Sequence, residues 1–377
     1  MSLIIITPLL CSLFIALSIK KEKKLDKRMT KTLPAIFILF GLMSVIGFMK
    51  NGMSALYDLG NYVMPMLALY YMATSEDKKL YALLTKTFYA LGVIVAVYGW
   101  IQYVWAPPWD TFWMIGSEMR SIGLPEPFEI RVFSLLNSPG PCGMFLAVVL
   151  AMCLMDRQLS KPVQLLLTAV IGSTLLLTSV RTAWIFVVAV LLFVAISNYK
   201  KDGFKQILKY AVTITAVILI SINLPAFSHI TDRLASFSDI ENDHSFNERM
   251  ELLDAFVPLV LLNPVGSGFG SNGLGTKINN GGEIGSLSIV DNGFLSIGIT
   301  FGLFGFIVYF WAISGTLRDL YRYKLPHAAG EYKPVFYAAI ISMAFGNGLI
   351  GLSGFCLWLM MAMPLLGSEV RNSSEGS

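Results

Sequence analysis

Charged residues are scarce in this sequence. Asp, Glu, Lys and Arg make up only 14% of its 377 residues, far below the roughly one quarter that is usual in soluble domains. Hydrophobic residues account for 55%, and the mean hydropathy is +0.66. The net charge of +4 gives no indication of nucleic-acid binding, and no such partner is expected. This composition excludes an ordinary soluble protein and predicts one large domain within a membrane.

Residues that bind metals or form disulfides are also few. The three histidines are too scattered for a zinc site, and there is no Cys-x-x-Cys pair. The four cysteines all lie in or at the ends of apolar runs: Cys11, Cys142, Cys153 and Cys356. We interpret them as buried free thiols that pack as small hydrophobic side chains. We expect no metal ion and no cofactor.

The sequence lacks the signatures of nucleotide binding and of ion-coupled transport. The glycine-rich run 266–270 has no Lys-Ser/Thr pair and follows no predicted strand, so it is not a P-loop. We interpret it as a sharp turn after Pro264 ends a helix. No internal repeat or interrupted helix is apparent, and charges within apolar segments are rare. Both observations disfavour a secondary transporter.

Apolar runs long enough to cross a membrane as helices recur along the chain. They lie at 2–19, 33–49, 56–73, 80–105, 139–155, 162–180, 182–197, 208–227, 291–315, 334–350 and 353–367. We therefore predict an all-α integral membrane protein with about eleven (10–12) transmembrane helices. One large extracytoplasmic loop should contain short helices.

The distribution of positive charge sets the predicted orientation. A cluster of Lys and Arg at 20–31 follows the first run, which lacks the basic n-region of a secretory signal. By the positive-inside rule this cluster is cytoplasmic, so the N-terminus lies outside and the C-terminus inside. A start outside is unusual and leaves open a further helix upstream. The predicted segments are helices 1–105, an outer loop 106–138, helices 139–227, the large loop 228–290, and C-terminal helices with a cytoplasmic tail, 291–377.

Arginine predominates among the cations that this topology places outside. Of the 28 Lys and Arg residues, seven lie there: Lys50, Arg120, Arg131, Arg181, Arg233, Arg249 and Lys277. Lysine predominates in the cytoplasmic segments. Because a guanidinium binds phosphate with two parallel hydrogen bonds, the outer face favours a phosphate-bearing ligand.

Arg181 and Arg249 are the first candidates for phosphate binding. Arg181 follows a sharp turn between two spans, and it is either an interfacial anchor beside Trp184 or a cation at the outer mouth of the helix bundle. Arg249 lies in a predicted helix, 246–262, with Ser245 as its N-cap and an apolar stripe suited to the membrane surface. The alternative for Arg249 is a weak surface ion pair.

Three further residues each have a simpler alternative. Arg120 and Arg131 flank Glu126 and Glu129, so these charges could neutralise one another instead of binding a ligand. The stretch after Arg131 is also typical of an ordinary turn and helix start. Asp291 opens the span after the large loop, where it either complements the helix dipole or serves as a general base.

Several motifs occur in a fixed order in the second half of the chain. Ser-x-Arg-Thr-Ala-Trp at 179–184 precedes the large loop, which contains Asn-Glu-Arg at 247–249 and Asn-Pro-Val-Gly-Ser-Gly-Phe-Gly at 263–270. Asp-Asn-Gly-Phe-Leu at 291–295 and Gly-Leu-Phe-Gly at 302–305 follow. In this order and spacing, roughly residues 130–315 resemble the O-antigen ligase/Wzy polymerase superfamily of bacterial polysaccharide assembly.

The resemblance implies a metal-independent glycosyltransferase on the outer side of the bacterial inner (plasma) membrane. Its donor would be a glycan carried on undecaprenyl diphosphate, with Arg181 and Arg249 matching the two arginines that hold the diphosphate. The ligase branch has a histidine and an acidic residue where this chain has Asp291 and Thr300, which favours a polymerase. Asp291 is the first candidate for the base, with His229 or His244 as alternatives.

The implied reaction requires an acceptor, which would be a lipid-linked or other glycan. A chain-length regulator and a flippase are further expected partners. An O-antigen ligase acting on lipid A core is the nearest alternative. A non-catalytic carrier or flippase for the same lipid-linked glycan, or a structural or sensory subunit of an export complex, are alternatives from other classes. A carrier should contain broken helices or charges along a path through the membrane.

Overall fold

The computed structural model describes residues 2–19, 32–75, 78–117, 122–156, 158–197, 254, 257–258, 260–273, 275–276, 290, 292–324 and 332–366. Within these residues the regular structure is helical, apart from one isolated antiparallel bridge between Gly123 and Ile130. The predicted all-α class is therefore confirmed for the described part. Helices at Leu33–Asn51, Lys79–Trp105 and Gly293–Tyr323 are long and apolar enough to cross a membrane. The number of eleven spans stays a prediction.

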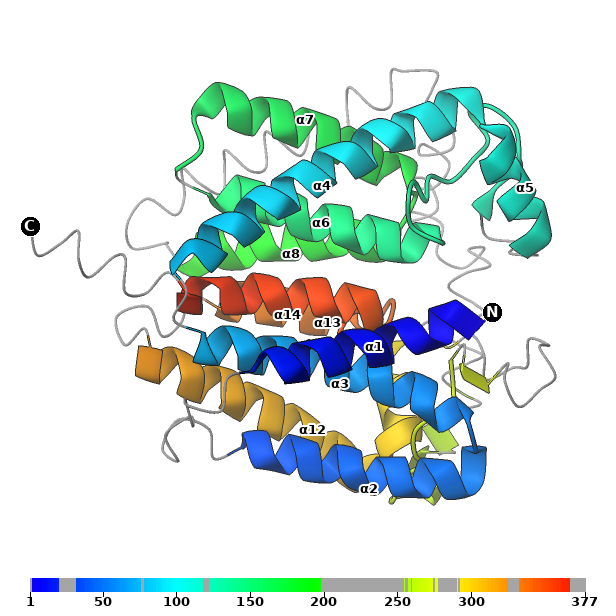
Figure 1. The fold of residues 1–377 in the computed structure, drawn as a ribbon, viewed down its shortest axis with the longest axis vertical. Helices are drawn as coiled ribbons and strands as arrows, with labels where there is room; N and C mark the ends of the chain where they lie inside the picture. Colours follow the sequence, from blue (N-terminus) through cyan, green and yellow to red (C-terminus); the bar gives the residue numbers. More distant parts are fainter. Residues whose placement is uncertain are drawn as a thin grey trace, which may run out of the picture. The chain divides into compact units, whose positions relative to one another are not determined.

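Figure 1 shows the order of the helices. They are α1 (Ser2–Ser18), α2 (Leu33–Asn51), α3 (Ser54–Thr74), α4 (Lys78–Trp105), α5 (Pro108–Ser117), α6 (Pro139–Met155), α7 (Lys161–Leu177), α8 (Arg181–Ser197), α12 (Gly293–Lys324), α13 (Lys333–Ser342) and α14 (Gly351–Leu366). Most predicted spans agree with one of these helices to within a few residues. The span predicted at 208–227 lies outside the described residues.

Three predictions need correction. The first concerns local structure only: the predicted outer segment 106–138 includes a helix that was not predicted, α5, in which Pro108 starts a helical segment that buries Asp110 and Met114 on one side. The segment 334–350 is not one span, since α13 ends at Ser342 and turns follow it up to α14. Helix α12 is interrupted at Gly302, whose φ of 66° and ψ of −177° are not helical.

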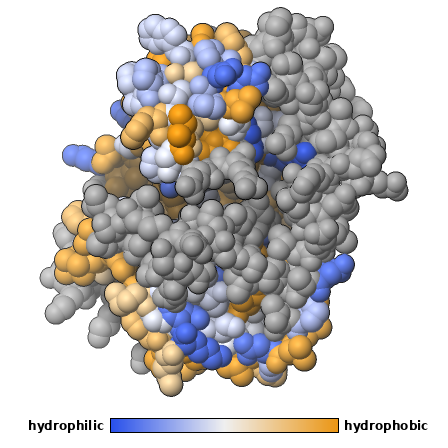
Figure 2. All heavy atoms as spheres, turned by 90° about the vertical axis from the view of Figure 1, so that its right-hand side faces the viewer, coloured by the Kyte–Doolittle hydropathy of each residue, from blue (hydrophilic) through white to orange (hydrophobic). Residues whose placement is uncertain are grey.

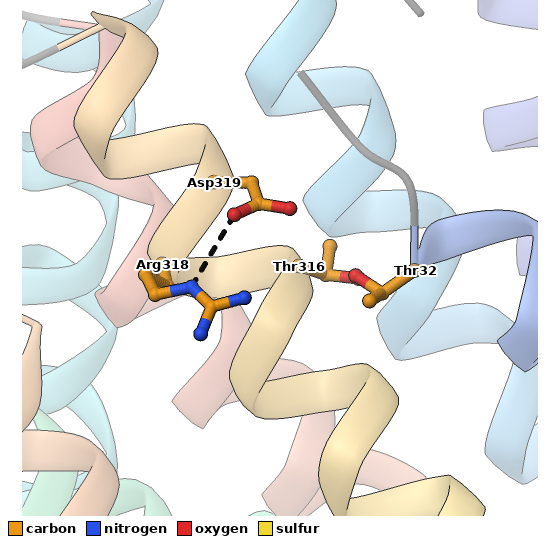
Figure 3. A network of polar contacts seen from close by, with 4 residues as sticks. All are labelled: Thr32, Thr316, Arg318 and Asp319. Carbon is orange, nitrogen blue, oxygen red and sulfur yellow. Dashed lines mark hydrogen bonds and ion pairs between the residues drawn. The ribbon is translucent and has the colours of Figure 1, made fainter. Parts of the chain in front are cut away.

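The chain forms two compact units. The first comprises Met1–Ala82, Glu248–Lys333 and Met343–Ser377. In it α3 packs against α1, α2 and α14, and α12 packs against α2. The hydroxyls of Thr32, just before α2, and Thr316 of α12 share a 2.9 Å hydrogen bond (Figure 3). Gly315 lacks the Cβ that would come within 2.7 Å of Thr32, so the two helices can approach closely here.

The second unit comprises Leu83–Asn247 and Pro334–Ser342. Helix α6 is its most buried element and packs against α7 and α8. Small residues permit this close packing: a Cβ on Gly99 of α4 would lie 2.5 Å from Thr174 and 2.9 Å from Val132, and one on Gly143 would lie 2.9 Å from Val180. These two glycines therefore bring α4 and α6 against the C-terminal end of α7 and the turn that follows it.

The four cysteines are free, as predicted. Cys142, Cys153 and Cys356 are buried, whereas Cys11 is exposed on α1, which corrects the expectation that all four are buried. Its apolar surroundings in sequence explain the error, because an apolar helix in a membrane can expose a side chain to lipid rather than to protein.

Candidate functional site

Arg181 is the first residue of α8 and follows a tight turn at the end of α7. Ser179 has a left-handed φ of 53°, and its N–H donates to the carbonyl oxygen of Leu176 at 3.0 Å. The Thr178 hydroxyl donates to the carbonyl oxygen of Leu175 at 2.7 Å. The chain thus reverses direction between α7 and α8 within a few residues, as the sequence predicted, and leaves Arg181 half-buried at the turn.

Arg131 lies against this same turn. Its Nη2 donates to the carbonyl oxygen of Ser179 at 3.1 Å, and its Nε donates to that of Thr178 at 3.4 Å. The N–H of Val132 donates to the carbonyl oxygen of Leu177 at 3.1 Å. Helix-terminal carbonyls lack partners within the helix and carry partial negative charge, so a guanidinium stabilises them. The structure therefore brings Arg131 to the turn that carries Arg181.

Gln102 of α4 holds the Arg131 segment in place. Its side-chain Oε1 accepts hydrogen bonds from the N–H groups of Phe133 and Ser134, each at 2.9 Å. The hydroxyl of Ser134 donates to the carbonyl oxygen of Val95 at 2.7 Å. Sequence reasoning missed Gln102, although an amide inside the apolar run 80–105 is a signal, because a buried polar side chain requires partners.

Trp184 is partly buried and packs beside the turn. Its ring contacts the buried cluster of Tyr103, Val132 and Leu177, and its indole Nε1–H donates to the carbonyl oxygen of Leu175 at 3.2 Å. The Ser-x-Arg-Thr-Ala-Trp motif is thus explained locally: Ser179 makes the turn, Trp184 ties α8 to α7, and Arg181 lies between them.

The glycine-rich run occupies the break in α12. The N–H groups of Ser267 and Gly268 donate to the carbonyl oxygens of Ile299 and Thr300 at 2.9 Å and 3.0 Å. In return the N–H of Phe304 donates to the carbonyl oxygen of Pro264 at 3.3 Å. These bonds replace helix bonds lost around Gly302, so the interruption is satisfied by protein backbone. The prediction of a turn at 266–270 was right but incomplete.

The other side of the glycine-rich run packs on α2 and α3. A Cβ on Gly47 would lie 2.5 Å from the carbonyl oxygen of Phe269, so only glycine permits this approach. Asn51 Nδ2 donates to the carbonyl oxygens of Ser267 and Phe269 at 3.0 Å and 2.8 Å. The buried carboxylate of Asp58 accepts from the N–H of Gly270 at 2.8 Å. The last part of the large loop is therefore anchored within the helices of its unit.

Phe269 anchors the run through its side chain. It is fully buried among aromatic rings, with ring centroids 5.1 Å from Tyr62 and 5.8 Å from both Phe40 and Phe301. Burial of an aromatic side chain contributes about 1.5–3 kcal/mol. The motif residue Phe269 is therefore a packing anchor.

A polar network surrounds the N-terminal end of α12. Asn272 Nδ2 donates to Thr300 Oγ1 at 2.9 Å, its Oδ1 accepts from Ser296 Oγ at 2.7 Å, and Asn347 Nδ2 donates to Ser296 Oγ at 3.0 Å. Asn292 caps α12 by accepting from the N–H of Leu295 at 3.1 Å. Thr300, which stands where the resemblance implies an acidic residue in ligases, is thus a buried structural residue.

The other predicted site residues lie outside the described part of the chain: Asp291, Arg249, Arg120, His229 and His244. Their nearest described neighbours agree with the predicted local structure. Asn292 begins α12 beside Asp291, and residues 260–262 are helical up to Asn263, where the predicted helix 246–262 should end. Val260 of this helix packs against Leu295 and Ile299 of α12.

Helices that are long and apolar enough to cross a membrane are consistent with an all-α membrane protein, and Arg131 contacts the turn that precedes Arg181. Residues 166–310 match the Wzy_C family model, described as O-Antigen ligase. The match confirms the resemblance found in the sequence, and it spans α7, the Arg181 turn, the glycine-rich run and much of α12. The match agrees at a coarse level with a membrane enzyme of the ligase or polymerase type. No curated protein and no solved structure matches the chain.

Proposed function

We propose that this protein is a glycan polymerase of the bacterial inner membrane. It transfers a glycan block from undecaprenyl diphosphate to a hydroxyl of an acceptor glycan, itself lipid-linked, on the outer side of the membrane. The observation that carries the proposal is the arginine-bearing turn between α7 and α8, which lies within the part of the chain that matches the O-antigen ligase family.

Arg181 and Arg249 bind the two phosphates of the donor in this proposal. The acceptor oxygen attacks the anomeric carbon, the bond from that carbon to the phosphate oxygen breaks, and the electron pair leaves with undecaprenyl diphosphate. Fixed guanidinium groups at the edge of the membrane stabilise this growing negative charge without rearranging, an effect that supplies several kcal/mol. Arg120 and Arg131 add positive charge to the same site.

Asp291 accepts the proton of the acceptor hydroxyl in this proposal, and His229 or His244 is the alternative base. Asn292, the neighbour of Asp291, is held by two hydrogen bonds. Its Oδ1 accepts from the N–H of Leu295, and its Nδ2 donates to the carbonyl oxygen of Ala344 at 3.3 Å. General base catalysis requires a group within hydrogen-bond reach of the proton that it accepts, and the proposal assigns this role to Asp291 from its place in the sequence beside this helix start.

A ligase is the second candidate, favoured by the description of the matching family model. It differs from the polymerase in the acceptor, which would be lipid A core. A carrier, which would move the lipid-linked glycan without transferring it to an acceptor, remains the non-enzymatic alternative. Its expected sign, a broken helix, is present at Gly302, but the backbone of residues 264–268 forms hydrogen bonds with the groups at that break.

The proposal is tested by reconstituting the purified protein with an undecaprenyl-diphosphate oligosaccharide and resolving the products by length. A polymerase lengthens the lipid-linked glycan, whereas a ligase leaves it unchanged until lipid A core is added. Asp291→Asn should abolish turnover and retain donor binding. Absence of transfer to either acceptor, together with movement of the intact donor across the vesicle membrane, would contradict the proposal and favour the carrier.

A further inference from the structure

Helix α5 packs on the segment that carries Arg131. Its Met114 lies in a buried cluster with Ile122, Ile130 and Phe133. Its Asp110 is buried and accepts a hydrogen bond from the Tyr98 hydroxyl of α4 at 2.9 Å. One face of α5 is therefore fixed to its own unit, and the helix cannot move without moving residues on both sides of Arg131.

The opposite face of α5 consists of large apolar side chains that are mostly exposed. Trp109, Phe112 and Ile115 are 65%, 79% and 70% exposed. The indole N–H groups nevertheless form hydrogen bonds. Trp109 Nε1 donates to the Tyr98 hydroxyl at 2.6 Å, and Trp113 Nε1 donates to the carbonyl oxygen of Asn137 at 3.4 Å. Their rings are thus held outward in fixed orientations. Figure 2 views the side on which α5 lies in Figure 1, and apolar and hydrophilic residues mix at the height of α5.

The exposed face of α5 continues the exposed face of α4. Apolar residues of α4 at helical spacing are exposed up to its end: Ile94, Val97, Ile101, Val104 and Trp105. Since α4 is long and apolar enough to cross a membrane, this exposed stripe is suited to contact with lipid chains. The left-handed residue Ala106, with a φ of 42°, then turns the chain into α5. The exposed apolar residues thus continue beyond the end of α4 with Trp109, Phe112 and Ile115, and aromatic residues of this kind gather at membrane–water interfaces.

We propose that α5 lies at the membrane–water interface on the outer side of the inner membrane. Its aromatic face then lies among the lipid headgroups and upper acyl chains. The occupant of the face is the phospholipid bilayer. Residues 108–117 contain no lysine or arginine, so the attraction is apolar and does not depend on anionic lipid. One consequence rests on the proposed function: because α5 packs on residues 122–133, its depth holds Arg131 and the Arg181 turn at the level of the donor's phosphates.

Spin-label depth measurements on the reconstituted full-length protein test the proposal. A nitroxide is attached at Phe112→Cys or Ile115→Cys in a Cys11→Ala background, since the other native cysteines are buried. Collision rates with oxygen and with a water-soluble nickel chelate then report depth. Glu126→Cys, at an exposed acidic position of the same outer segment, is the control for water. Two label positions on one face allow for failure of either variant to fold.

Both labels on α5 should collide more with oxygen than with the nickel chelate, at a depth of about 5–10 Å below the phosphates. The Glu126 label should show the reverse. Replacing neutral lipid by anionic lipid should leave the α5 depth unchanged. Labels on α5 as accessible to nickel as the Glu126 label would place the helix in water. Labels shielded from both reagents would mean that a second copy of the chain covers the face, and either result would overturn the proposal.

The consequence for the donor is measured separately. Phe112→Ser combined with Ile115→Ser should raise KM for the lipid-linked donor several-fold and leave kcat within about twofold, because the turn moves while its chemistry remains. If the wild type has no transferase activity, the proposed function fails while the depth result stands. If the depth is interfacial but KM is unchanged in the double variant, α5 does not position the donor site.

Discussion

The guanidinium of Arg131 donates to the carbonyl oxygen of Ser179 at 3.1 Å, and Arg181 begins α8 two residues further on. Arg131 thus fixes the backbone that presents Arg181. Its planar group reaches two consecutive carbonyls, Thr178 and Ser179, which an ammonium group cannot match with the same geometry. The relationship makes Arg131 a positioning residue for Arg181, whatever charge it adds to the site.

Arg131→Lys should therefore lose activity despite keeping its charge. Hydrogen bonds to a charged group contribute about 1.5–3 kcal/mol, so we expect a decrease of about tenfold or more in kcat/KM for Arg131→Ala and a smaller one for Arg131→Lys. Steady-state kinetics with the lipid-diphosphate donor measure both. Full activity of Arg131→Ala at unchanged thermal stability would show that the turn holds Arg181 without help.

Gln102→Met should disturb the same turn indirectly, through the segment that carries Arg131. The substitution preserves volume but leaves the N–H groups of Phe133 and Ser134 without their buried acceptor, which costs about 1–3 kcal/mol. We expect a lower thermal midpoint in detergent and a raised KM for the donor.

The matched control for Gln102 is Gln164→Met. Gln164 also bonds backbone, donating to the carbonyl oxygen of Cys153 at 2.8 Å, but it lies at the start of α7, whereas the Arg181 turn follows the end of that helix. Its loss should lower the thermal midpoint and leave KM unchanged. A raised KM in both variants would mean that the effect is general destabilisation.

Gly302→Ala should strongly destabilise the protein. Its Cβ would lie 2.3 Å from the nitrogen of Gly266 and 2.4 Å from the carbonyl oxygen of Pro264, at a left-handed φ of 66°. The left-handed conformation alone costs a residue with a Cβ about 1–2 kcal/mol, and the clash adds to it. Thermal unfolding in detergent should show the loss.

Gly41→Ala serves as the control for Gly302. It lies inside α2 with nothing within 4 Å of an added Cβ, so alanine should be neutral or stabilising by up to about 1 kcal/mol. Equal stability of Gly302→Ala and Gly41→Ala would disprove the tight backbone packing between the glycine-rich run and α12.

Hydropathy and charge predicted the helices well where each apolar run ended at a clear polar signal. The run 182–197 and the turn before Arg181 are examples, because Thr178, Ser179 and the charge itself mark the boundary. The break at Gly302 was missed because it depends on a partner more than 30 positions away in sequence: Ser267 and Gly268 replace the helix bonds. The sequence of the helix alone does not indicate that a distant segment replaces its hydrogen bonds.

The candidate site was predictable in part. Arginine at a forced turn between two spans identified Arg181, and the structure places Arg131 on the same turn. The role of Gln102 was not predictable, because a lone amide in an apolar run does not reveal which backbone groups it will bond. Helix α5 was not predicted within the segment 106–138, although proline suits the first turn of a helix and Pro108 begins α5.

The most direct test of the account is the donor turnover of Arg181→Ala, compared with that of Arg318→Ala. Arg318 is an exposed arginine of α12 that forms a 3.4 Å ion pair with the adjacent Asp319 (Figure 3), so its removal controls for loss of a positive charge. In proteoliposomes with an undecaprenyl-diphosphate oligosaccharide, Arg181→Ala should lose roughly a hundredfold or more in kcat, since removal of one fixed donor to a developing oxyanion costs about 2.7–4 kcal/mol. Arg318→Ala should retain wild-type turnover. Unchanged glycan transfer by a properly folded Arg181→Ala protein would contradict the account.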